Sequence, residues 1–318
     1  RRGGENNIAL LKSWGCKFIH GDIRNREDIE ELPKVDWIID CAAIPTVTAG
    51  ADSGTLSLIN NNLAGTIYLL EKCRRDQAGF IILSTSRVYN IQQLNQLPLV
   101  EQSTRFTVDL SKELPVGFSE AGVRETFSTS APISLYGATK VASEVLALEY
   151  HHTFGFPVWV NRCGVIAGPG QFGKIDQGIF SFWIYQYLLD RPLSFIGFGG
   201  TGKQVRDLIH PLDIYRMVEL QINKVMNREA PLILNLGGGN ESSMSLLELD
   251  EFCKHRLPQN KIVGSDAATR RFDIPYYVTD NSLARQSWNW TPTLSALDVL
   301  EQIVQYGTNN MQQIKSLL

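Results

Sequence analysis

Tyr136 and Lys140 stand four residues apart in the stretch Tyr136-Gly-Ala-Thr-Lys140, which the following residues continue as a predicted helix to about residue 152. Residues at i and i+4 share a helix face, so the phenol and the ammonium can reach one bound molecule. A free tyrosine has a pKa near ~10 and is a poor base at neutral pH, but a nearby ammonium favours the phenolate. Such a pair can take a proton from an alcohol while hydride leaves the same carbon. The spacing also arises by chance, and the structural alternative is an exposed tyrosine stacked on a lysine stem.

Two small hydroxyl residues, Ser84 and Thr85, follow the apolar run 80–83. That run predicts a buried strand, and open α/β sheets bind their ligands at the carboxyl ends of such strands. The two hydroxyls are therefore candidates for contact with a ligand. Either one alone could instead cap a turn.

The elements that would position these side chains alternate along the chain. Apolar segments predict strands at 17–20, 36–41, 80–83, 157–162, 205–209 and 231–236. Periodic segments predict helices at 6–14, 26–32, 56–75, 138–152, 177–189, 244–256 and 295–316. This alternation predicts an α/β fold built on a doubly wound parallel sheet.

The glycine-rich turn that holds a pyrophosphate in such sheets is missing from the sequence. It ordinarily follows the first strand and opens a helix, and here no Gly-x-x-Gly-x-x-Gly stretch stands before a strand. We expect that the sequence begins downstream of that element, because a sheet without its central strand would keep two unpaired edges. The alternative is a protein that has lost the element.

Two irregular segments interrupt the alternation. The 46 residues 90–135 form an unusually long polar connection, which predicts either a functional loop over the site or disorder. The glycine-rich stretch 197–203 has the glycine and lysine spacing of a phosphate-binding loop, but Gln204 stands where a Ser or Thr would hold magnesium. Because residues 205–209 then continue as a strand rather than a helix, we predict a glycine-rich hairpin instead.

The composition describes a globular protein of balanced charge. Its 318 residues are 43% hydrophobic and carry a net charge of −3, without a basic stripe or an apolar run of membrane-spanning length. These features argue against nucleic acid as a partner and against a membrane protein. The five cysteines have no Cys-x-x-Cys spacing and the five histidines form no metal-ligand cluster, so we expect a cytoplasmic protein with reduced thiols and no metal.

Taken in order, these motifs make the chain similar to the extended short-chain dehydrogenases/reductases of the nucleotide-sugar epimerase/dehydratase group. The resemblance spans nearly the whole chain, and each motif alone is modest. The matching segments are Gly21-Asp22-Ile23, Asn62-Leu-Ala-Gly-Thr66, Ser84-Thr85 with Val88-Tyr89, Tyr136 with Lys140, Gln204 to His210, and Arg270-Arg271-Phe272-Asp273. Within the group, the CDP-paratose 2-epimerases (CDP-tyvelose epimerases) resemble it most, through Gly170-Gln171-Phe172, Asp176-Gln177-Gly178 and Gly202 to Asp207.

The resemblance implies an NAD-dependent reaction on a nucleotide sugar. Tyr136 would be the base, Lys140 would stabilise the phenolate, and Thr85 would hydrogen-bond the reacting oxygen. NAD contacts are implied for Asp22, Ile23, Ala42, Ala43, Asn62, Ser84, Tyr136, Lys140 and Cys163. Substrate contacts are implied for Arg87, Gln171, Gln177, Gln204, Arg206 and Arg270, with Arg206 and Arg270 as a clamp on the diphosphate.

The implied reaction is inversion of C2 of a CDP-dideoxyhexose through a keto intermediate. A 4-epimerase or a sugar reductase remains open because the same three groups serve all of them, and a non-catalytic NAD-binding relative is the alternative from another class. A 4,6-dehydratase is disfavoured, since Ser86-Arg87 stands where an Asp-Glu pair is usual. Two further departures from the family pattern are Asp40-Cys-Ala-Ala43, where His-x-Ala is usual, and Leu83, which replaces a serine.

The resemblance also implies how the chain is organised. Residues 1–167 would form the NAD-binding Rossmann domain, to which 205–240 return, and 168–318 would be mainly a smaller substrate-binding subdomain. The helices 56–75 and 138–152 would pair copies of the chain in a homodimer or homotetramer.

Overall fold

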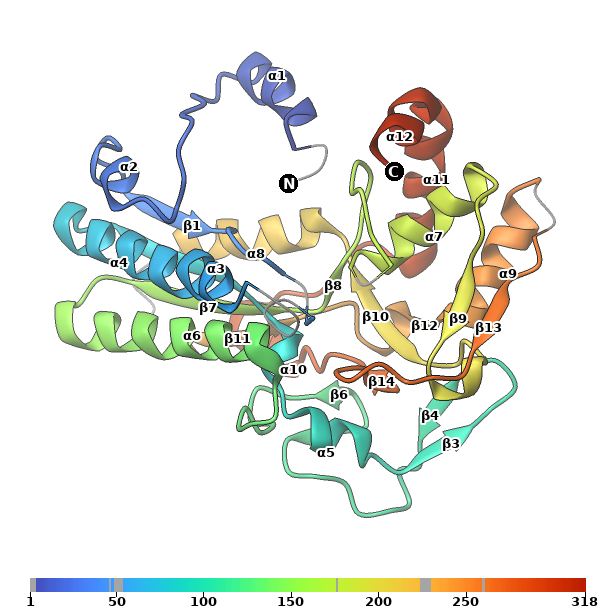
Figure 1. The fold of residues 1–318 in the computed structure, drawn as a ribbon. Coiled ribbons are helices and arrows are strands. Elements are labelled where there is room, and N and C mark those ends of the chain that lie inside the picture. Colours follow the sequence, from blue (N-terminus) through green and yellow to red (C-terminus); the bar gives the residue numbers. More distant parts are fainter. Residues whose placement is uncertain (1–3, 46, 49–53, 176, 224–229, 259–260) are drawn as a thin grey trace.

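A parallel sheet of four strands occupies one half of the molecule (Figure 1). The computed structural model describes residues 4–45, 47–48, 54–175, 177–223, 230–258 and 261–318. The sheet strands, in spatial order, are β1 (Trp37–Asp40), β2 (Gly79–Thr85), β7 (Val158–Cys163) and β11 (Ile233–Leu236). All neighbouring pairs run parallel, and Thr85 stands opposite Cys163. The carboxyl ends of the strands therefore meet at one edge of the sheet.

Helices cover both faces of this sheet. On one face lie α4 (Gly65–Asp76) and α6 (Ser134–Phe154), and on the other lie α8 (Pro211–Asn223) and α10 (Ser282–Trp288). Side chains alternate along a strand, so Phe80 and Ile82 pack against α4 and α6 while Ile81 packs against α8 and α10. This burial on two sides confirms the predicted doubly wound α/β fold.

The segment before α4 contains three short helices besides β1. It includes α1 (Asn6–Ser13), α2 (Arg26–Glu30) and α3 (Thr55–Ile59). A π-helical turn, Asn60–Ala64, joins α3 to α4. Such wide turns are rare and are frequent at functional sites, and this one contains Asn62.

The second half of the molecule is built around β10 (Val205–Ile209). It pairs with β12 (Ser243–Ser245), β14 (Tyr276–Tyr277) and β8 (Val165–Ile166), while β9 (Ser194–Ile196) pairs with β13 (Gly264–Asp266). The helices of this half are α7 (Ile179–Leu188), α9 (Leu246–Arg256), α11 (Ala296–Asn309) and α12 (Met311–Leu317), and they enclose one hydrophobic core. Segment 205–240 is shared, because β10 belongs to this half and β11 to the parallel sheet.

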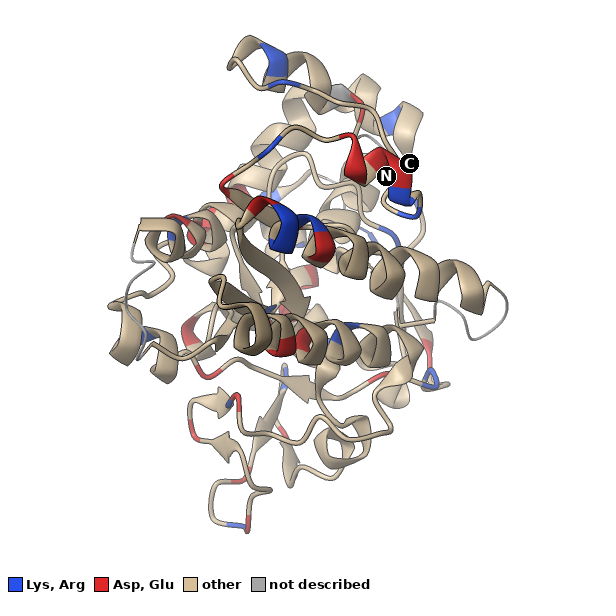
Figure 2. Cartoon of the chain, turned by 90° about the vertical axis from the view of Figure 1, so that its left-hand side faces the viewer, with Lys and Arg blue, Asp and Glu red and all other residues tan. Residues whose placement is uncertain are grey.

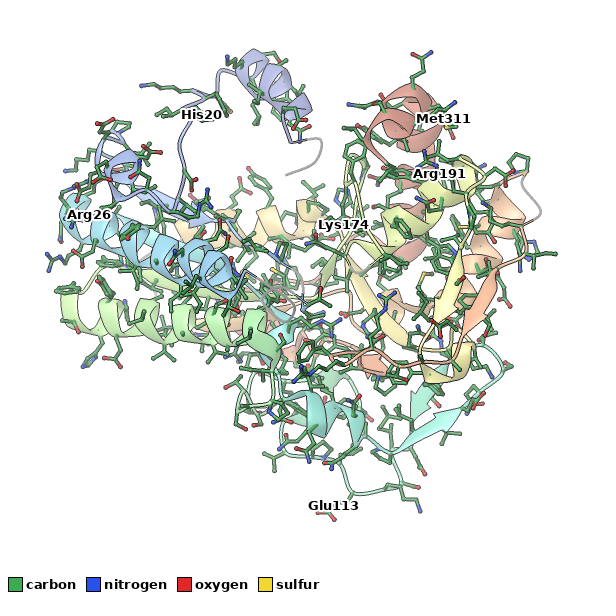
Figure 3. The ribbon with its side chains drawn as sticks, viewed as in Figure 1. His20, Arg26, Glu113, Lys174, Arg191 and Met311 are labelled. Atoms are coloured by element: carbon green, nitrogen blue, oxygen red, sulfur yellow. The ribbon has the colours of Figure 1, made fainter. Side chains whose placement is uncertain are left out.

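The connection 90–135 is folded, so the disorder alternative is wrong. It contains α5 (Ile91–Asn95) and the antiparallel pairs β3 (Leu99–Glu101) with β4 (Phe106–Val108) and β5 (Phe118–Ser119) with β6 (Gly122–Val123). Arg105 is paired with Glu248 and Arg124 with Asp280, which ties the connection to later parts of the chain. Figure 3 shows Glu113 at its outer edge, pointing away from the body.

Two predicted elements are absent. Residues 17–20 form no strand, and Phe18 is 44% exposed, because no described strand lies beside the segment to pair with it. The stretch 197–203 is not a hairpin, because the strands on either side of it belong to different sheets. Four glycines of positive φ turn the chain from one sheet to the other: Gly197, Gly199, Gly200 and Gly202.

Charge is dispersed over the surface. Figure 2 shows Lys and Arg interspersed with Asp and Glu along the helices that cover the parallel sheet. Across the described ranges, no helix has both the length and the apolar character needed to cross a bilayer.

Candidate active site

A cavity of about 470 Å³ lies between the carboxyl edge of the parallel sheet and the second half of the molecule. It brings together residues that are far apart in the sequence. From the sheet half come Ser84, Thr85, Arg87, Tyr136 and Cys163, and from the second half come Gln171, Gln177, Gln204, Arg206 and Arg270. Every substrate contact that the sequence predicted therefore lines one cavity with Thr85 and Tyr136.

Tyr136 enters the cavity from the first turn of α6. A glycine follows it because the helix lies against the strand-end turn: a Cβ on Gly137 would stand 2.4 Å from the carbonyl oxygen of Arg87. Ser134 supports the same turn, with its hydroxyl accepting from the Gly137 N–H at 3.2 Å. The close approach places the phenol, only 6% exposed, beside the end of β2.

Lys140 lies one turn further along α6, behind the cavity wall. It is 1% exposed, and its ammonium has no hydrogen bond or ion pair within the described part of the chain. Burial lowers the pKa of Lys140, while the negative charges of Asp40 and Glu144 oppose that shift. A buried donor without a partner suits the hydroxyls of a ribose, so the residues at this end of the cavity fit the nicotinamide half of NAD.

The two strand-end hydroxyls differ in their partners. The Thr85 hydroxyl accepts from the Arg87 N–H at 3.2 Å, and its proton has no acceptor among the described residues. It can therefore donate to an oxygen in the cavity. The Ser84 hydroxyl donates to the Glu144 carboxylate, which is also paired with Arg162 at 2.7 Å.

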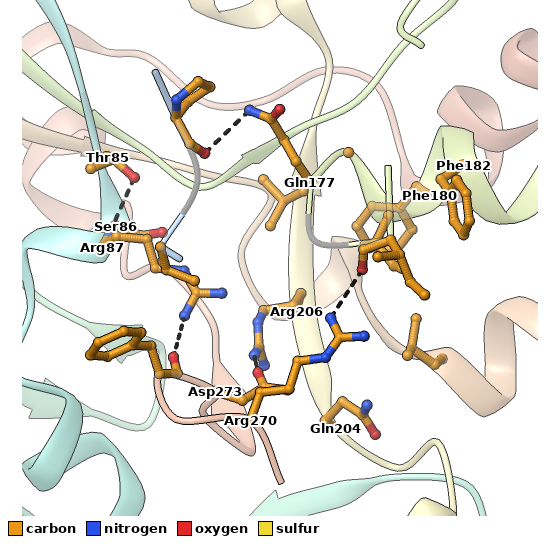
Figure 4. Close-up of a pocket in the computed structure, with 18 of the residues that line it drawn as sticks. Thr85, Ser86, Arg87, Gln177, Phe180, Phe182, Gln204, Arg206, Arg270 and Asp273 are labelled. Atoms are coloured by element: carbon orange, nitrogen blue, oxygen red, sulfur yellow. Dashed lines mark hydrogen bonds and ion pairs between the residues drawn. The ribbon is translucent and has the colours of Figure 1, made fainter. Parts of the chain in front are cut away.

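Guanidinium groups crowd the opposite end of the cavity, as Figure 4 shows for Arg87, Arg206 and Arg270. Arg206 donates to the Asp273 carboxylate at 3.1 Å and to the Ile274 carbonyl at 2.6 Å. Arg87 donates to the Phe272 carbonyl at 3.4 Å. Burial, and then the charge of Arg87, lower the pKa of Arg206 to about 10, so the Arg206 guanidinium is charged at neutral pH. Burial also lowers the pKa of Arg87.

This end carries an excess of positive charge. Among the described residues, four arginines line the cavity, counting the exposed Arg271, against one carboxylate, that of Asp273. Arginine forks bind pairs of phosphate oxygens, so the arrangement suits a diphosphate. The described residues contain no group of three or more His, Cys, Asp or Glu side chains that could hold a metal ion.

The three predicted glutamines are fixed by the protein itself. Their side-chain amides donate to backbone carbonyls, Gln171 to Ile166 at 2.9 Å, Gln177 to Pro45 at 3.2 Å, and Gln204 to Ile196 at 3.1 Å. Each amide oxygen is thereby given a fixed direction. Gln177 also joins the second half to the loop that follows β1. Asp176, which precedes it, lies outside the residues that the structure describes.

The remaining predicted NAD contacts lie outside the cavity lining. The Asn62 side chain is occupied by the protein, since it accepts from the Ile44 N–H at 2.8 Å and donates to the Thr139 hydroxyl at 3.2 Å. Ala42 and Ala43 lie in the loop after β1. Asp22 is bound bidentately by Arg24, which holds the pKa of that carboxyl at about 2, and Ile23 packs against Gly65.

Sequence reasoning missed the acceptors that hold the arginines. Asp273 and the carbonyls of Phe272 and Ile274 orient Arg87 and Arg206. The motif Arg270-Arg-Phe-Asp273 could have indicated this role of Asp273. An aspartate close to a predicted phosphate-binding arginine would repel the phosphate, so a second role for its carboxylate is expected. The aromatic wall formed by Phe180, Phe182 and Trp183 was also missed, although the aromatic-rich helix that carries it was predicted.

Comparisons with known proteins agree with this geometry. A family model described as "NAD dependent epimerase/dehydratase family" matches residues 1–237. The chain is 27% identical to CDP-paratose 2-epimerase of Salmonella typhi, over 97% of this chain and 90% of the relative. It is 29% identical to a UDP-glucuronate 4-epimerase of Thermodesulfobacterium geofontis, over 97% and 84%.

A solved structure extends the similarity to three dimensions. UDP-glucuronic acid 4-epimerase from Bacillus cereus, in complex with UDP-glucuronic acid and NAD, superposes with a TM-score of 0.74 and 26% identity. The match covers 98% of this chain and 86% of that one.

Proposed function

The chain belongs to the NAD-dependent epimerase/dehydratase family, and we propose that it is a nucleotide-sugar epimerase that inverts C2 of a CDP-dideoxyhexose through a transient keto intermediate. One observation carries the proposal: a single cavity joins Tyr136 and Thr85 to a cluster of arginines that suits a diphosphate. CDP is favoured by the likeness to CDP-paratose 2-epimerase. The protein would work in the cytoplasm as a homodimer or homotetramer.

NAD, when bound, supplies the acceptor and later the donor of the hydride. The residues proposed to hold its nicotinamide half are Ser84, Tyr136, Lys140 and Cys163, and those proposed for the rest are Asp22, Ile23, Ala42, Ala43 and Asn62. Lys140 fits because its buried ammonium has no partner among the residues that the structure describes. Burial raises the pKa of Cys163 to about 12, so it is present as a neutral thiol.

Tyr136 takes the proton from the sugar hydroxyl in the first half of the reaction and returns it in the second. Lys140 lies one turn away and stabilises the phenolate between the two steps. Thr85 donates its free proton to the reacting oxygen, and a preorganised donor of this kind is worth about 3 kcal/mol in the transition state. The buried walls of the cavity keep water from the keto intermediate.

The arginines hold the nucleotide while the sugar turns. Arg206 and Arg270 are proposed to clamp the diphosphate, with Arg87 on the side nearer to Tyr136. The ketone must present its other face before hydride returns, so a firm grip on the diphosphate and a looser one on the sugar suit epimerisation. Gln171, Gln177 and Gln204 are proposed to contact the substrate along the same wall. The Gln171 oxygen already accepts from the Ser181 hydroxyl at 3.0 Å, whereas the Gln204 oxygen is buried without a partner among the described residues.

A 4-epimerase of a UDP-sugar is the second candidate, because one relative and one solved structure of comparable similarity have that activity. A sugar reductase would use the same three groups. A dehydratase is disfavoured because the 3₁₀ turn Ser86–Val88 places Arg87, rather than an acid, beside Thr85. A non-catalytic NAD-binding relative is the alternative that an activity assay must exclude.

Two measurements test the proposal. Purified protein should carry NAD(H), visible by mass spectrometry, or be stabilised to heat by added NAD. Incubation with CDP-tyvelose should then invert C2, followed by NMR. Turnover of a UDP-hexose at C4 without inversion at C2 would move the protein to the 4-epimerases, and absence of any NAD effect would remove the enzyme proposal.

A further inference from the structure

A buried ion pair lies behind the cavity wall, and the reaction proposed above does not use it. Glu144 lies four residues after Lys140 on α6, and Arg162 belongs to β7. Both side chains are buried, and Arg162 donates to the Glu144 carboxylate through Nη2 at 2.7 Å and through Nε at 3.1 Å. A third group, the Ser84 hydroxyl, donates to the same carboxylate. Ser84 stands opposite Arg162 in the register of β2 and β7, so the three side chains meet on one face of the sheet.

The ion pair is held from several sides. Nη1 of Arg162 donates to the Glu125 carbonyl at 3.1 Å and to the Tyr89 hydroxyl at 3.4 Å. That hydroxyl donates in turn to the side-chain oxygen of Asn235 at 2.5 Å. Because a buried charge that loses its partner is strongly destabilising, the pair keeps this arrangement and the Glu144 carboxylate stays directed at Ser84.

The contact with Glu144 determines what Ser84 can offer to a ligand. A serine hydroxyl has one proton and two lone pairs. The Ser84 proton is taken by Glu144, and no described residue donates to the Ser84 oxygen, which belongs to the cavity lining. Ser84 therefore presents an acceptor. Thr85 is its opposite, because its oxygen accepts from the Arg87 N–H and its proton remains available.

The free acceptor lies at the same end of the cavity as the catalytic pair. Tyr136, Lys140 and Glu144 follow one another at intervals of four residues on α6, so they share a face of that helix. Glu144 contacts Ser84, which places Ser84 where the nicotinamide half of NAD fits. The nicotinamide ring carries a carboxamide, whose NH₂ group is a donor that needs an acceptor.

We propose that Glu144 is a positioning residue that takes up the Ser84 proton, so that Ser84 accepts a hydrogen bond from the carboxamide NH₂ of the nicotinamide. Glu144 itself does not touch the ligand. It fixes the polarity of Ser84, and the hydrogen bond from the carboxamide then fixes the orientation of the ring. The inference rests on the NAD part of the proposed function and not on the sugar or the carbon that reacts.

The first test compares two dinucleotides on cofactor-free, full-length protein by calorimetry. In 3-acetylpyridine adenine dinucleotide a methyl ketone replaces the carboxamide, so the donor is missing. Ser84→Ala should reduce the preference for NAD over this analogue about 3- to 10-fold, the ratio that one hydrogen bond gives. Ser86→Ala is the matched control, because Ser86 lines the same cavity but forms no hydrogen bond with Glu144 in the described part of the chain.

The second test reverses the polarity of Ser84 through Glu144→Gln. Arg162 has only donors, so the glutamine oxygen should face Arg162 and its NH₂ group should face Ser84. The Ser84 hydroxyl then turns its proton into the cavity. The preference for NAD over the acetylpyridine analogue should fall as in Ser84→Ala. The dinucleotide of nicotinic acid, whose carboxylate is an acceptor, should bind about tenfold more tightly than it binds the unchanged protein. A purely structural role of Glu144 would weaken all three dinucleotides by the same factor.

An unchanged NAD preference in Ser84→Ala would overturn the proposal, as would an equal loss in Ser86→Ala. If Glu144→Gln fails to fold, Ser84→Ala still reports the polarity. A hydroxyl free to donate would bind the nicotinic acid carboxylate, so weaker binding of that dinucleotide to Ser84→Ala would also count against the proposal. The expected NAD preference in a protein that inverts no CDP-sugar would keep this inference and remove the proposed function.

Discussion

At one end of the cavity a single ammonium, that of Lys140, is buried, whereas at the other end four arginines face one carboxylate among the described residues, that of Asp273. We call these the lysine end and the arginine end. At the lysine end the ammonium has no ion-pair partner within the described ranges, so the proton that it holds decides the state of the site. At the arginine end positive charge is in excess, so an anion has to complete it. The first arrangement suits chemistry and the second suits binding.

Tyr136→Phe should produce the largest difference between turnover, which depends on the lysine end, and ligand binding, which depends on the arginine end. It removes the proposed base without touching an arginine, so turnover should fall by about 10²- to 10⁴-fold, while the affinity for CDP stays within about twofold. Steady-state kinetics and calorimetry with CDP measure the two effects. Activity within tenfold of the unchanged protein would assign the base to another group.

Arg206→Met should act at the arginine end. Hydrogen bonds to charged groups contribute about 1.5–3 kcal/mol, so the dissociation constant for CDP should rise about 10- to 100-fold. Turnover at saturating substrate should change much less. Arg271→Met is the matched control, because Arg271 lines the same cavity but is exposed. Equal effects of the two variants would refute a specific role for Arg206.

The pH dependence of turnover should arise from the lysine end. Because burial lowers the pKa of Lys140 below its ordinary value of 10.5, the ammonium is lost as the pH rises through that lowered value, and turnover should fall about tenfold for each further pH unit. The stability of the folded protein should change with pH in the opposite direction to turnover. Between the two pKa values the unfolded chain binds more protons at Lys140 than the folded chain, so the Lys140 contribution to the free energy of unfolding increases with pH there.

Measurements of turnover and of urea unfolding over the same pH range check this sign. Loss of activity that tracks loss of folded protein would mean that unfolding, rather than Lys140, sets the alkaline limb.

Asp273→Asn should give the smallest effect. The carboxylate competes with a bound diphosphate for Arg206, so its removal should tighten CDP binding by roughly two- to fivefold, in keeping with the modest value of partly exposed ion pairs. Calorimetry with CDP measures it. Binding weakened by more than tenfold would mean that Asp273 serves mainly to orient Arg206.

The sequence allowed the prediction of local elements and of residues with strong chemistry. The strands of the parallel sheet, strand β10, the helix that carries Tyr136 and Lys140, and three of the cavity arginines were expected, because apolar runs and reactive side chains are visible in one dimension. The short strands β3 to β6, β8 and β9 were not predicted. The predicted membership of the epimerase/dehydratase family is also confirmed.

What escaped prediction depends on partners far away in the chain. Residues 17–20 have the composition of a strand but no strand to pair with, and the turn after Gly197 joins two sheets whose pairing no local pattern reveals. The role of Asp273 follows from its contact with Arg206, so this aspartate looks ordinary in the sequence. Helices α8 and α10 were not predicted from the sequence.

The π-helical turn Asn60–Ala64 amounts to one extra residue inserted into an otherwise regular helix. Deleting one residue there would restore the α-helix and rotate everything beyond it by about 100°. Either the Asn62 contacts with Ile44 and Thr139 or the Thr66 contact with Asp40 would then be lost, because the two sets would no longer face the same side. The extra residue thus sets the helix register so that one helix forms hydrogen bonds with a loop, a strand end and a neighbouring helix at the same time.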